Sequence, residues 1–289
     1  MKSYVLLFSF LTLSLSLSSQ IRTPPLSQKQ TISQKVGFTE IDIEYCRPLM
    51  RGRTIFGDLV PYDKIWRTGA NRNSQITFSD KVVIGDYELD KGTYTLFTKP
   101  SKTEWKVFFY PYDNGYGVPK DFEETKAIAT TSAPTFTLNR TLQNLTIQLD
   151  NVTENEAELI IAWERTLLSV PIKFRTKEEI LGKVDDLIND HSGDYYMAAK
   201  YYLDNNLDLE KAKAFIQKSI ELRDQPGGTP KFWIYQLKAE ILLANNEKDE
   251  ALKAASKAMS MAASRGKDDY YVKQISDLLG RLKLSLIHI

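Results

Sequence analysis

Residues 51–71 read RGRTIFGDLVPYDKIWRTGAN, and this stretch decides how the first half of the chain folds. Three glycines, Gly52, Gly57 and Gly69, are spread among arginines, aromatic residues and a proline. Glycine reaches backbone conformations that other residues avoid, so we expect a connector of fixed shape here and not a helix.

The same stretch is predicted to form an anion or carbohydrate pocket. Arg51, Arg53 and Arg67 would donate hydrogen bonds, because guanidinium groups bind carboxylate or phosphate through two parallel N–H groups. Trp66 would serve as a stacking platform and Asn71 as an orienting amide. Between positions 47 and 72 there are six basic residues and two acidic ones, so this is the basic patch of the chain.

A structural interpretation of the same residues stays open. In it the arginines pair with Asp58, Asp63 or carboxylates of neighbouring strands, and Trp66 lies in the core. Guanidinium groups buried inside the protein and paired with its own acidic residues would favour this interpretation, whereas a shallow surface with Arg67 paired internally would favour a scaffold over an enzyme.

Residues 34–175 follow a period of two and are rich in Thr, Tyr, Phe, Val and Ile. Apolar residues at 41, 43 and 45 alternate with acidic residues at 40, 42 and 44, as in a half-buried strand. The turn signals between the runs predict an antiparallel β-sandwich or flattened barrel. The further strands are expected at 75–79, 81–84, 93–98, 105–110, 135–139, 145–149, 158–163 and 167–174.

Residues 176–289 lose the alternation and are predicted to be helical, so the whole chain is an α+β multidomain protein. Asp194 and Asp208 are the expected helix caps. Two similar segments place Ala212 and Ala251 39 residues apart, which resembles a tetratricopeptide-like array of helical hairpins. The helices are expected at 178–190, 194–205, 209–223, 230–245, 248–264 and 268–283.

Several motifs together resemble one family of exported bacterial proteins, domain-of-unknown-function family 2911. The resemblance covers roughly residues 34–175, and members are often followed by a helical segment. It implies a domain boundary near 175 and brings no reaction, cofactor or catalytic residue. The motifs are Tyr45-Cys-Arg-Pro48, Arg51-Gly-Arg53, Phe56-Gly57, Leu59-Val60-Pro61, Trp66-Arg-Thr-Gly-Ala-Asn71, Gly92-Thr-Tyr94 and Trp105.

The first 19 residues have the layout of a secretory signal peptide. Lys2 precedes an apolar run from 5 to 17, and small residues follow at Ser18 and Ser19. A membrane anchor is the competing interpretation, but this run is shorter than the roughly 20 apolar residues that span a bilayer. We therefore expect a soluble protein, exported to the periplasm or beyond after cleavage.

Charge and residue usage argue against several functions. Residues 20–175 carry 20 basic and 19 acidic residues, and residues 176–289 carry 17 and 18, so neither half favours nucleic acid. Cys46 is the only cysteine, and the histidines are His191 and His288. We expect no metal site, no cofactor and no catalytic residue, with His191 in a surface loop.

The function expected from the sequence is that of an exported, non-enzymatic binding or scaffold protein. The helical array would hold a protein or peptide partner, and the β domain would recognise an anionic ligand or a glycan. The alternative is an envelope hydrolase that uses carboxylates near the arginine cluster. A close pair of carboxylates facing Arg51 or Arg67 in a cleft would favour the enzyme.

Overall fold

The computed structural model describes residues 23–186, 191–223 and 231–287. The chain forms two compact units, Met1–Lys177 and Glu178–Ile289, called the β unit and the helical unit below. An antiparallel sheet makes up the first and six α-helices the second, so the α+β composition is confirmed. The expected signal peptide lies outside the described residues.

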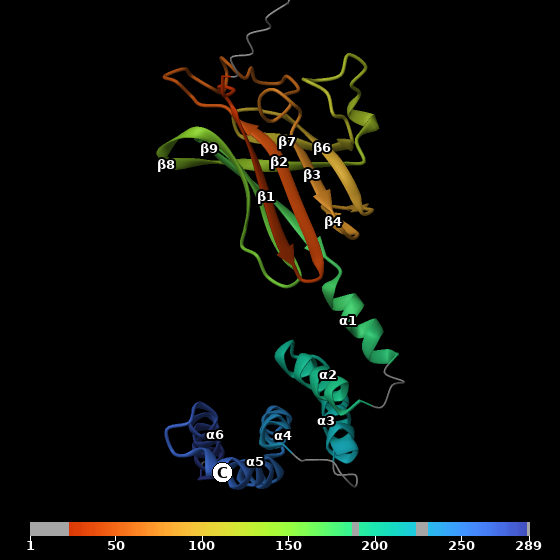
Figure 1. Cartoon of the computed structure of the whole chain (residues 1–289), viewed down its shortest axis with the longest axis vertical. Helices are drawn as coiled ribbons and strands as arrows, with labels where there is room; N and C mark the ends of the chain where they lie inside the picture. The colour runs from red at the N-terminus through yellow and green to blue at the C-terminus, as the bar shows by residue number, and fades with distance from the viewer. Residues whose placement is uncertain (1–22, 187–190, 224–230, 288–289) are drawn as a thin grey trace, which may run out of the picture. The chain divides into compact units, whose positions relative to one another are not determined.

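Nine strands of the β unit form one hydrogen-bonded series in the order β1-β2-β3-β6-β7-β8-β9-β4-β5 (Figure 1). Every neighbouring pair is antiparallel. Only one short 3-10 helix, η1 (Glu124–Lys126), interrupts the connections between the described strands. The strands are β1 (Gln28–Val36), β2 (Thr39–Arg47), β3 (Gln75–Phe78), β4 (Val82–Ile84), β5 (Tyr87–Leu89), β6 (Gly92–Lys99), β7 (Glu104–Pro111), β8 (Ala129–Asp150) and β9 (Glu156–Phe174).

Strand β2 shows how one face of the sheet comes to be buried in the core. Ile41, Ile43 and Tyr45 are buried in the core, as the alternation predicts, and the acidic residues between them point outward. Opposite Ile43 lie Ile32 of β1 and Ile76 of β3. The Tyr45 hydroxyl also accepts a hydrogen bond from the Ile147 amide of β8 at 3.0 Å, which ties β2 to a strand far along the chain.

The prediction of four separate strands between 135 and 174 is wrong, because two long strands cover this range. β8 and β9 run through the expected breaks as one extended, strongly curved hairpin (Figure 1). The pairing register shifts on both sides of Leu142, and Glu164 has a positive φ of 56°. These bulges bend the strands without ending them.

The alternation also misses strands β1 and β5. Residues Gln28–Val36 read QKQTISQKV, and only Ile32 and Val36 are apolar, so the run resembles a loop by composition. The strand forms because β2 supplies nine consecutive pairing partners for it. The β domain therefore begins several residues before the expected position 34.

Strands β6 and β7 are buried on both faces. Leu96 and Phe109 point into the main core, and Phe97 and Phe108 point into a smaller cluster on the other face. Phe122 covers that cluster and stacks on Tyr110, with ring centroids 4.8 Å apart. Glu124 of η1 secures this cover, because its carboxylate accepts hydrogen bonds from Lys99 at 3.0 Å and Lys106 at 3.1 Å.

The helical unit contains helices near all six expected positions, and the turns that follow α2 and α4 are alike. After α2 the amide of Leu207 donates to Tyr202, and after α4 the amide of Glu247 donates to Leu242 in the same way. In the described residues, no helix is long and apolar enough to cross a membrane. The helices are α1 (Thr176–Asp185), α2 (Ser192–Asp204), α3 (Leu209–Arg223), α4 (Phe232–Ala244), α5 (Lys248–Ala262) and α6 (Tyr270–Ile287), with a 3-10 turn η2 (Ala263–Arg265).

Of the two expected helix caps, one is confirmed and one is wrong. Asp208 accepts hydrogen bonds from the amides of Glu210 at 3.0 Å and Lys211 at 3.1 Å, as an N-cap does. Asp194 lies inside the first turn of α2 instead, because that helix begins two residues earlier, at Ser192.

We predict that Glu124 stabilises the β unit in a pH-dependent way. The hydrogen bonds from Lys99 and Lys106 hold the pKa of Glu124 below its ordinary value of 4.5. A lowered pKa in the folded state means that the stabilisation is present above pH 4.5 and disappears as the pH falls through the folded value. The substitution Glu124→Gln should therefore lower the free energy of unfolding at pH 7, and wild type and variant should converge in strong acid.

The expected loss is less than about 1 kcal/mol, because the carboxylate is partly exposed and solvent screens it. Urea unfolding at pH 7 and in strong acid measures the difference. Glu123→Gln is the matched control, since the ion pair that Glu123 forms within the described part of the chain is with Lys126 on the same turn. An equal loss in both variants at pH 7 would contradict the role of Glu124.

We also predict that the two aspartates differ in their contribution to stability. Asp208→Ala removes two hydrogen bonds to amides of the first turn of α3 and should cost about 1 kcal/mol. Asp194→Ala should cost less, because only its favourable charge near a helix start is lost. Thermal unfolding, followed by the circular dichroism signal of the helices, compares the two variants. An equal loss of stability in both would contradict the role of Asp208 as a helix cap.

Candidate functional site

The candidate site is built on the connector, residues 48–74, which joins β2 to β3. Ile55, Phe56 and Val60 anchor it in the main core. It contains no helix and no regular strand, as expected from its glycines. Six residues between 51 and 71 have a positive φ, which gives the connector a fixed, folded course.

Trp66 is attached to the sheet at the centre of the connector. Its amide donates to the Thr98 carbonyl of β6 at 2.7 Å, and the Thr98 amide donates back to the Trp66 carbonyl at 2.9 Å. Two residues later the chain turns sharply at Thr68, which is fully buried and has a φ of 52°. A positive φ is a rare conformation for a β-branched residue, and such strain gathers at functional sites.

Because Gly69 has no side chain, the backbone after this turn can pass close to Ser74. A Cβ atom there would lie 2.7 Å from the Ser74 hydroxyl oxygen, which itself donates to the Thr68 carbonyl at 2.8 Å. The Arg-Thr-Gly sequence thus fixes the direction in which the preceding Arg67 side chain leaves the backbone.

Arg67 lines a pocket of about 380 Å³, called the Arg67 pocket below. Its side chain is half-buried, and its Nε atom is buried with no hydrogen-bond partner. No carboxylate lines the pocket in the described part of the chain. The lining residues are Ser27, Pro48, Arg53, Leu59, Val60, Ile65, Trp66, Arg67, Gly69, Ala70, Gly117, Val118 and Trp163.

Arg53 brings a second positive charge to the Arg67 pocket. Its Nε donates to the Met50 carbonyl at 3.0 Å and its Nη2 to the Leu49 carbonyl at 2.8 Å. These bonds hold the guanidinium in place, and no carboxylate of the described residues neutralises its charge. Among the described residues, Arg51, Arg53 and Arg67 form no salt bridge, and Asp58 and Asp63 lie exposed.

The inner wall of the pocket is aromatic. Trp66 stacks on Trp163 of β9, with ring centroids 6.1 Å apart and planes 18° apart. Phe56 of the connector does not line the pocket but packs edge-on against both tryptophans, with ring centroids 6.3 and 6.4 Å away, and against Trp105 of β7 at 4.7 Å. The Trp163 Nε1 donates to the Gln143 carbonyl at 3.1 Å, so this ring is fixed from behind.

A loop after β7 forms the outer wall, and Asn73 holds it there. The Asn73 side chain donates to the Asp113 carboxylate at 3.1 Å and accepts from the Gly117 amide at 2.8 Å. Gly117 has a φ of 121°, and a Cβ atom there would lie 3.5 Å from Arg67 Nη1. The loop backbone therefore passes close to the guanidinium.

The structure brings together three of the five residues chosen from sequence: Arg53, Trp66 and Arg67. Arg51 and Asn71 do not line the pocket. Arg51 is exposed on a turn, and the Asn71 amide donates to the Ser27 carbonyl at 3.2 Å.

Sequence reasoning missed Trp163 and the loop at Gly117. Residues Asp113-Asn114-Gly115 lie in the loop after β7, and nothing in this short sequence shows that the loop packs against the connector. Cys46 is buried, and His191 is exposed just before α2. No group of three or more His, Cys, Asp or Glu residues that could hold a metal occurs in the ranges that the structure describes.

Comparison with known protein families identifies a match to the β unit. Residues 27–172, about half of the chain, match a family model described as "Protein of unknown function (DUF2911)". No curated protein and no solved structure matches the chain.

We predict that Arg67 contributes nothing to the stability of the fold. It is a half-buried cation without a hydrogen-bond partner for Nε, and replacing such a group with an apolar one of similar length is neutral or stabilising. Arg67→Met should therefore leave the unfolding midpoint unchanged or raise it slightly.

Arg47→Met is the matched control. Arg47 Nε donates to the Leu145 carbonyl at 2.9 Å and its Nη2 to the Thr146 hydroxyl at 3.1 Å, linking β2 to β8. Losing these bonds should cost about 2 kcal/mol in urea unfolding. A comparable loss for Arg67→Met would show that Arg67 serves the fold.

Proposed function

This chain belongs to the DUF2911 family, whose description gives no activity, and we propose that its β unit binds a small carboxylate ligand in the Arg67 pocket. The protein then acts as a binding protein and not as an enzyme. Within the described residues, no Asp or Glu lines this pocket, so nothing there favours the hydrolase alternative.

One observation carries this proposal: the Arg67 guanidinium has a buried Nε with no partner. Removing a charged N–H group from water without a hydrogen bond is costly, so folded proteins rarely leave one in that state. A ligand carboxylate in the pocket would accept that hydrogen bond and recover the cost. The left-handed Thr68 supports the same idea, because strain is maintained where geometry matters for function.

The lining of the pocket favours a carboxylate with a flat or apolar body. The planar fork of arginine matches a carboxylate, and Arg53 adds a second positive charge. Trp66, Ile65 and the exposed side chains of Leu59 and Val118 provide apolar surface for the rest of the ligand. A few polar groups on mainly apolar walls are typical of small-molecule sites.

The wider expectations remain proposals as well. We propose export to the periplasm or beyond, a sandwich-like β domain and a tetratricopeptide-like helical unit that holds a protein or peptide. The matching turns after α2 and α4, with Asn206 and Asn246 both at positive φ, support an internal repeat. Buried alanines at 212 and 251 support close packing of its helices.

The test of the carboxylate proposal is isothermal titration calorimetry with benzoate, indole-3-acetate and phosphate. Benzamide and indole-3-acetamide are the uncharged controls. We expect at least one carboxylate to bind while its amide does not. At about 100 times its dissociation constant it should stabilise the β unit by about 2.7 kcal/mol. Binding should weaken as salt rises, because the attraction is ionic.

Two variants locate the binding. Arg67→Met should abolish it, and Arg51→Gln should leave it intact, since Arg51 lies outside the pocket. Equal binding by Arg67→Met and wild type would place the ligand elsewhere. Binding of phosphate and of neither carboxylate would reject a carboxylate as the ligand.

A further inference from the structure

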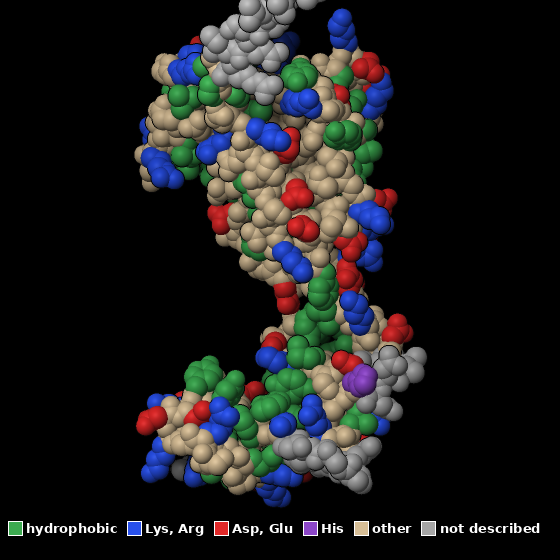
Figure 2. Space-filling model, viewed as in Figure 1, with side chains coloured by type: hydrophobic (Ala, Val, Ile, Leu, Met, Phe, Trp, Pro, Cys, Tyr) green, Lys and Arg blue, Asp and Glu red, His purple; other side chains and the backbone are tan. Residues whose placement is uncertain are grey.

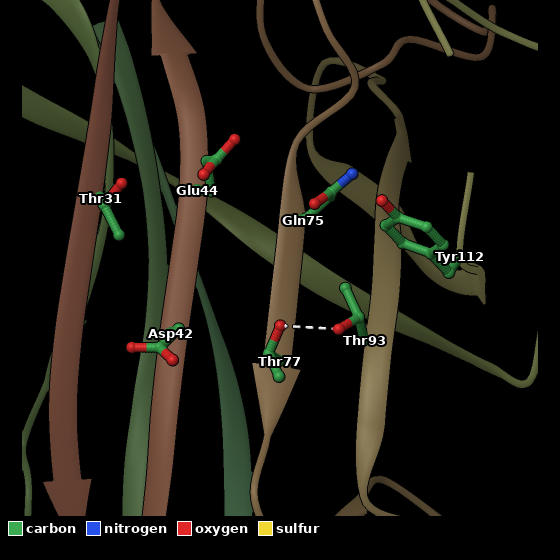
Figure 3. Close-up of a pocket in the computed structure, with 7 residues that line it drawn as sticks. All are labelled: Thr31, Asp42, Glu44, Gln75, Thr77, Thr93 and Tyr112. Carbon is green, nitrogen blue, oxygen red and sulfur yellow. Dashed lines mark hydrogen bonds between the residues drawn. The ribbon is translucent and has the colours of Figure 1, made fainter. Parts of the chain in front are cut away.

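A second cavity lies on the polar face of the sheet, away from the residues of the Arg67 pocket. It has a volume of about 610 Å³ and is called the polar hollow below. Strands β1, β2, β3 and β6 form its floor, and Tyr112, just after β7, stands beside it (Figure 3). The lining residues are Thr31, Asp42, Glu44, Gln75, Thr77, Thr93 and Tyr112.

The strand register explains the floor of the hollow. Asp42 of β2 faces Thr77 of β3, and Thr77 in turn faces Thr93 of β6. Side chains at such facing positions project from the same face of the sheet. Short polar side chains therefore form a continuous row across three strands, and the two threonine hydroxyls at its end lie 2.9 Å apart (Figure 3).

Several hydrogen-bonding groups of the hollow have no partner among the residues that the structure describes. The side chains of Asp42, Gln75 and Tyr112 form no hydrogen bond with another described residue, and Figure 3 shows them around the same hollow. Glu44 is different, because Lys29 neutralises it at 2.8 Å. The hollow thus offers one free carboxylate, one amide and one phenol, which together can both accept and donate hydrogen bonds.

Tyr112 adds an aromatic surface to these polar groups. The residue is 57% exposed, although most large apolar residues of the β unit are buried. An exposed ring with a polar tip suits a ligand that is apolar on one face and hydroxylated at its edge. A sugar ring has these properties, with C–H groups on its faces and hydroxyls around its rim.

We propose that the polar hollow binds a neutral oligosaccharide chain. Tyr112 stacks on a sugar ring, the Asp42 carboxylate accepts hydrogen bonds from sugar hydroxyls, and the Gln75 amide bonds to a neighbouring unit. Hydrogen bonds from hydroxyls to a carboxylate are stronger than those between neutral groups.

The charge of the surface favours a neutral chain over other ligands. The visible face of the β unit is mainly neither acidic nor basic, with a few acidic groups in its middle and basic groups above and below them (Figure 2). The free Asp42 would repel an anionic ligand such as a nucleic acid or an acidic glycan. Two carboxylates, one of them already paired with lysine, are too few to hold calcium without other strong ligands.

The experiment is calorimetric titration of the full chain with cellohexaose, maltohexaose, laminarihexaose and chitohexaose. We expect at least one of the four to bind. Tyr112→Ala and Asp42→Asn should each weaken that binding by about tenfold or more, as for groups at the centre of a contact. Tyr87→Ala is the matched control, because Tyr87 is an exposed tyrosine of β5 outside the hollow, and it should bind like wild type.

Three outcomes would overturn the proposal. One is the absence of binding to all four oligosaccharides, and another is equal binding by wild type and Asp42→Asn. The third is a calcium-dependent rise in melting temperature that disappears in Asp42→Asn, which would identify a cation site instead. Arg67→Met should bind the oligosaccharide normally, so failure here and failure of the carboxylate proposal are distinguishable.

Discussion

The packing of the connector onto the sheet through aromatic rings is the contact on which the candidate site depends. Phe56 lies against Trp105, and Trp66 lies against Trp163, so two rings of the connector meet two rings of the strands. Aromatic pairs of this kind stabilise by about 0.5–1.5 kcal/mol beyond the area that they bury. Because these rings hold the connector, the short bridge between Trp66 and Thr98 can form, and the backbone can accept a strained turn at Thr68.

The sequence predicted the parts of the fold in which local pattern and burial agree. In β2 each apolar residue is buried and each acidic residue points outward, so alternation alone identifies the strand. Prediction from sequence failed where pairing with a neighbouring strand overrides the local conformational preference of the residues. β1 is a strand because β2 supplies its partners, and β8 and β9 continue through residues that look like turns because bulges absorb the irregularity. Neither effect leaves a local signal.

The residues of the candidate site could be predicted where they lie close together in the sequence. Arg53, Trp66 and Arg67 lie in one short glycine-rich segment, and their residue types alone indicated an anion pocket. Trp163 comes from a strand almost 100 residues later in the sequence, and Gly117 from a loop that Asn73 holds in place. Long-range packing decides both positions, so no pattern in the sequence could identify them.

Strands β1 and β5 lie at the two ends of the strand order. The composition of β1 affects how the protein behaves at high concentration. A strand at the end of a sheet can pair with the same strand of another molecule and start aggregation. In β1, Lys29 and Lys35 lie among glutamines and serine, and both lysines are exposed. Like charges would face each other if two copies met along this edge. The polar composition that hides β1 from sequence analysis therefore also keeps the molecule from adding strands to itself.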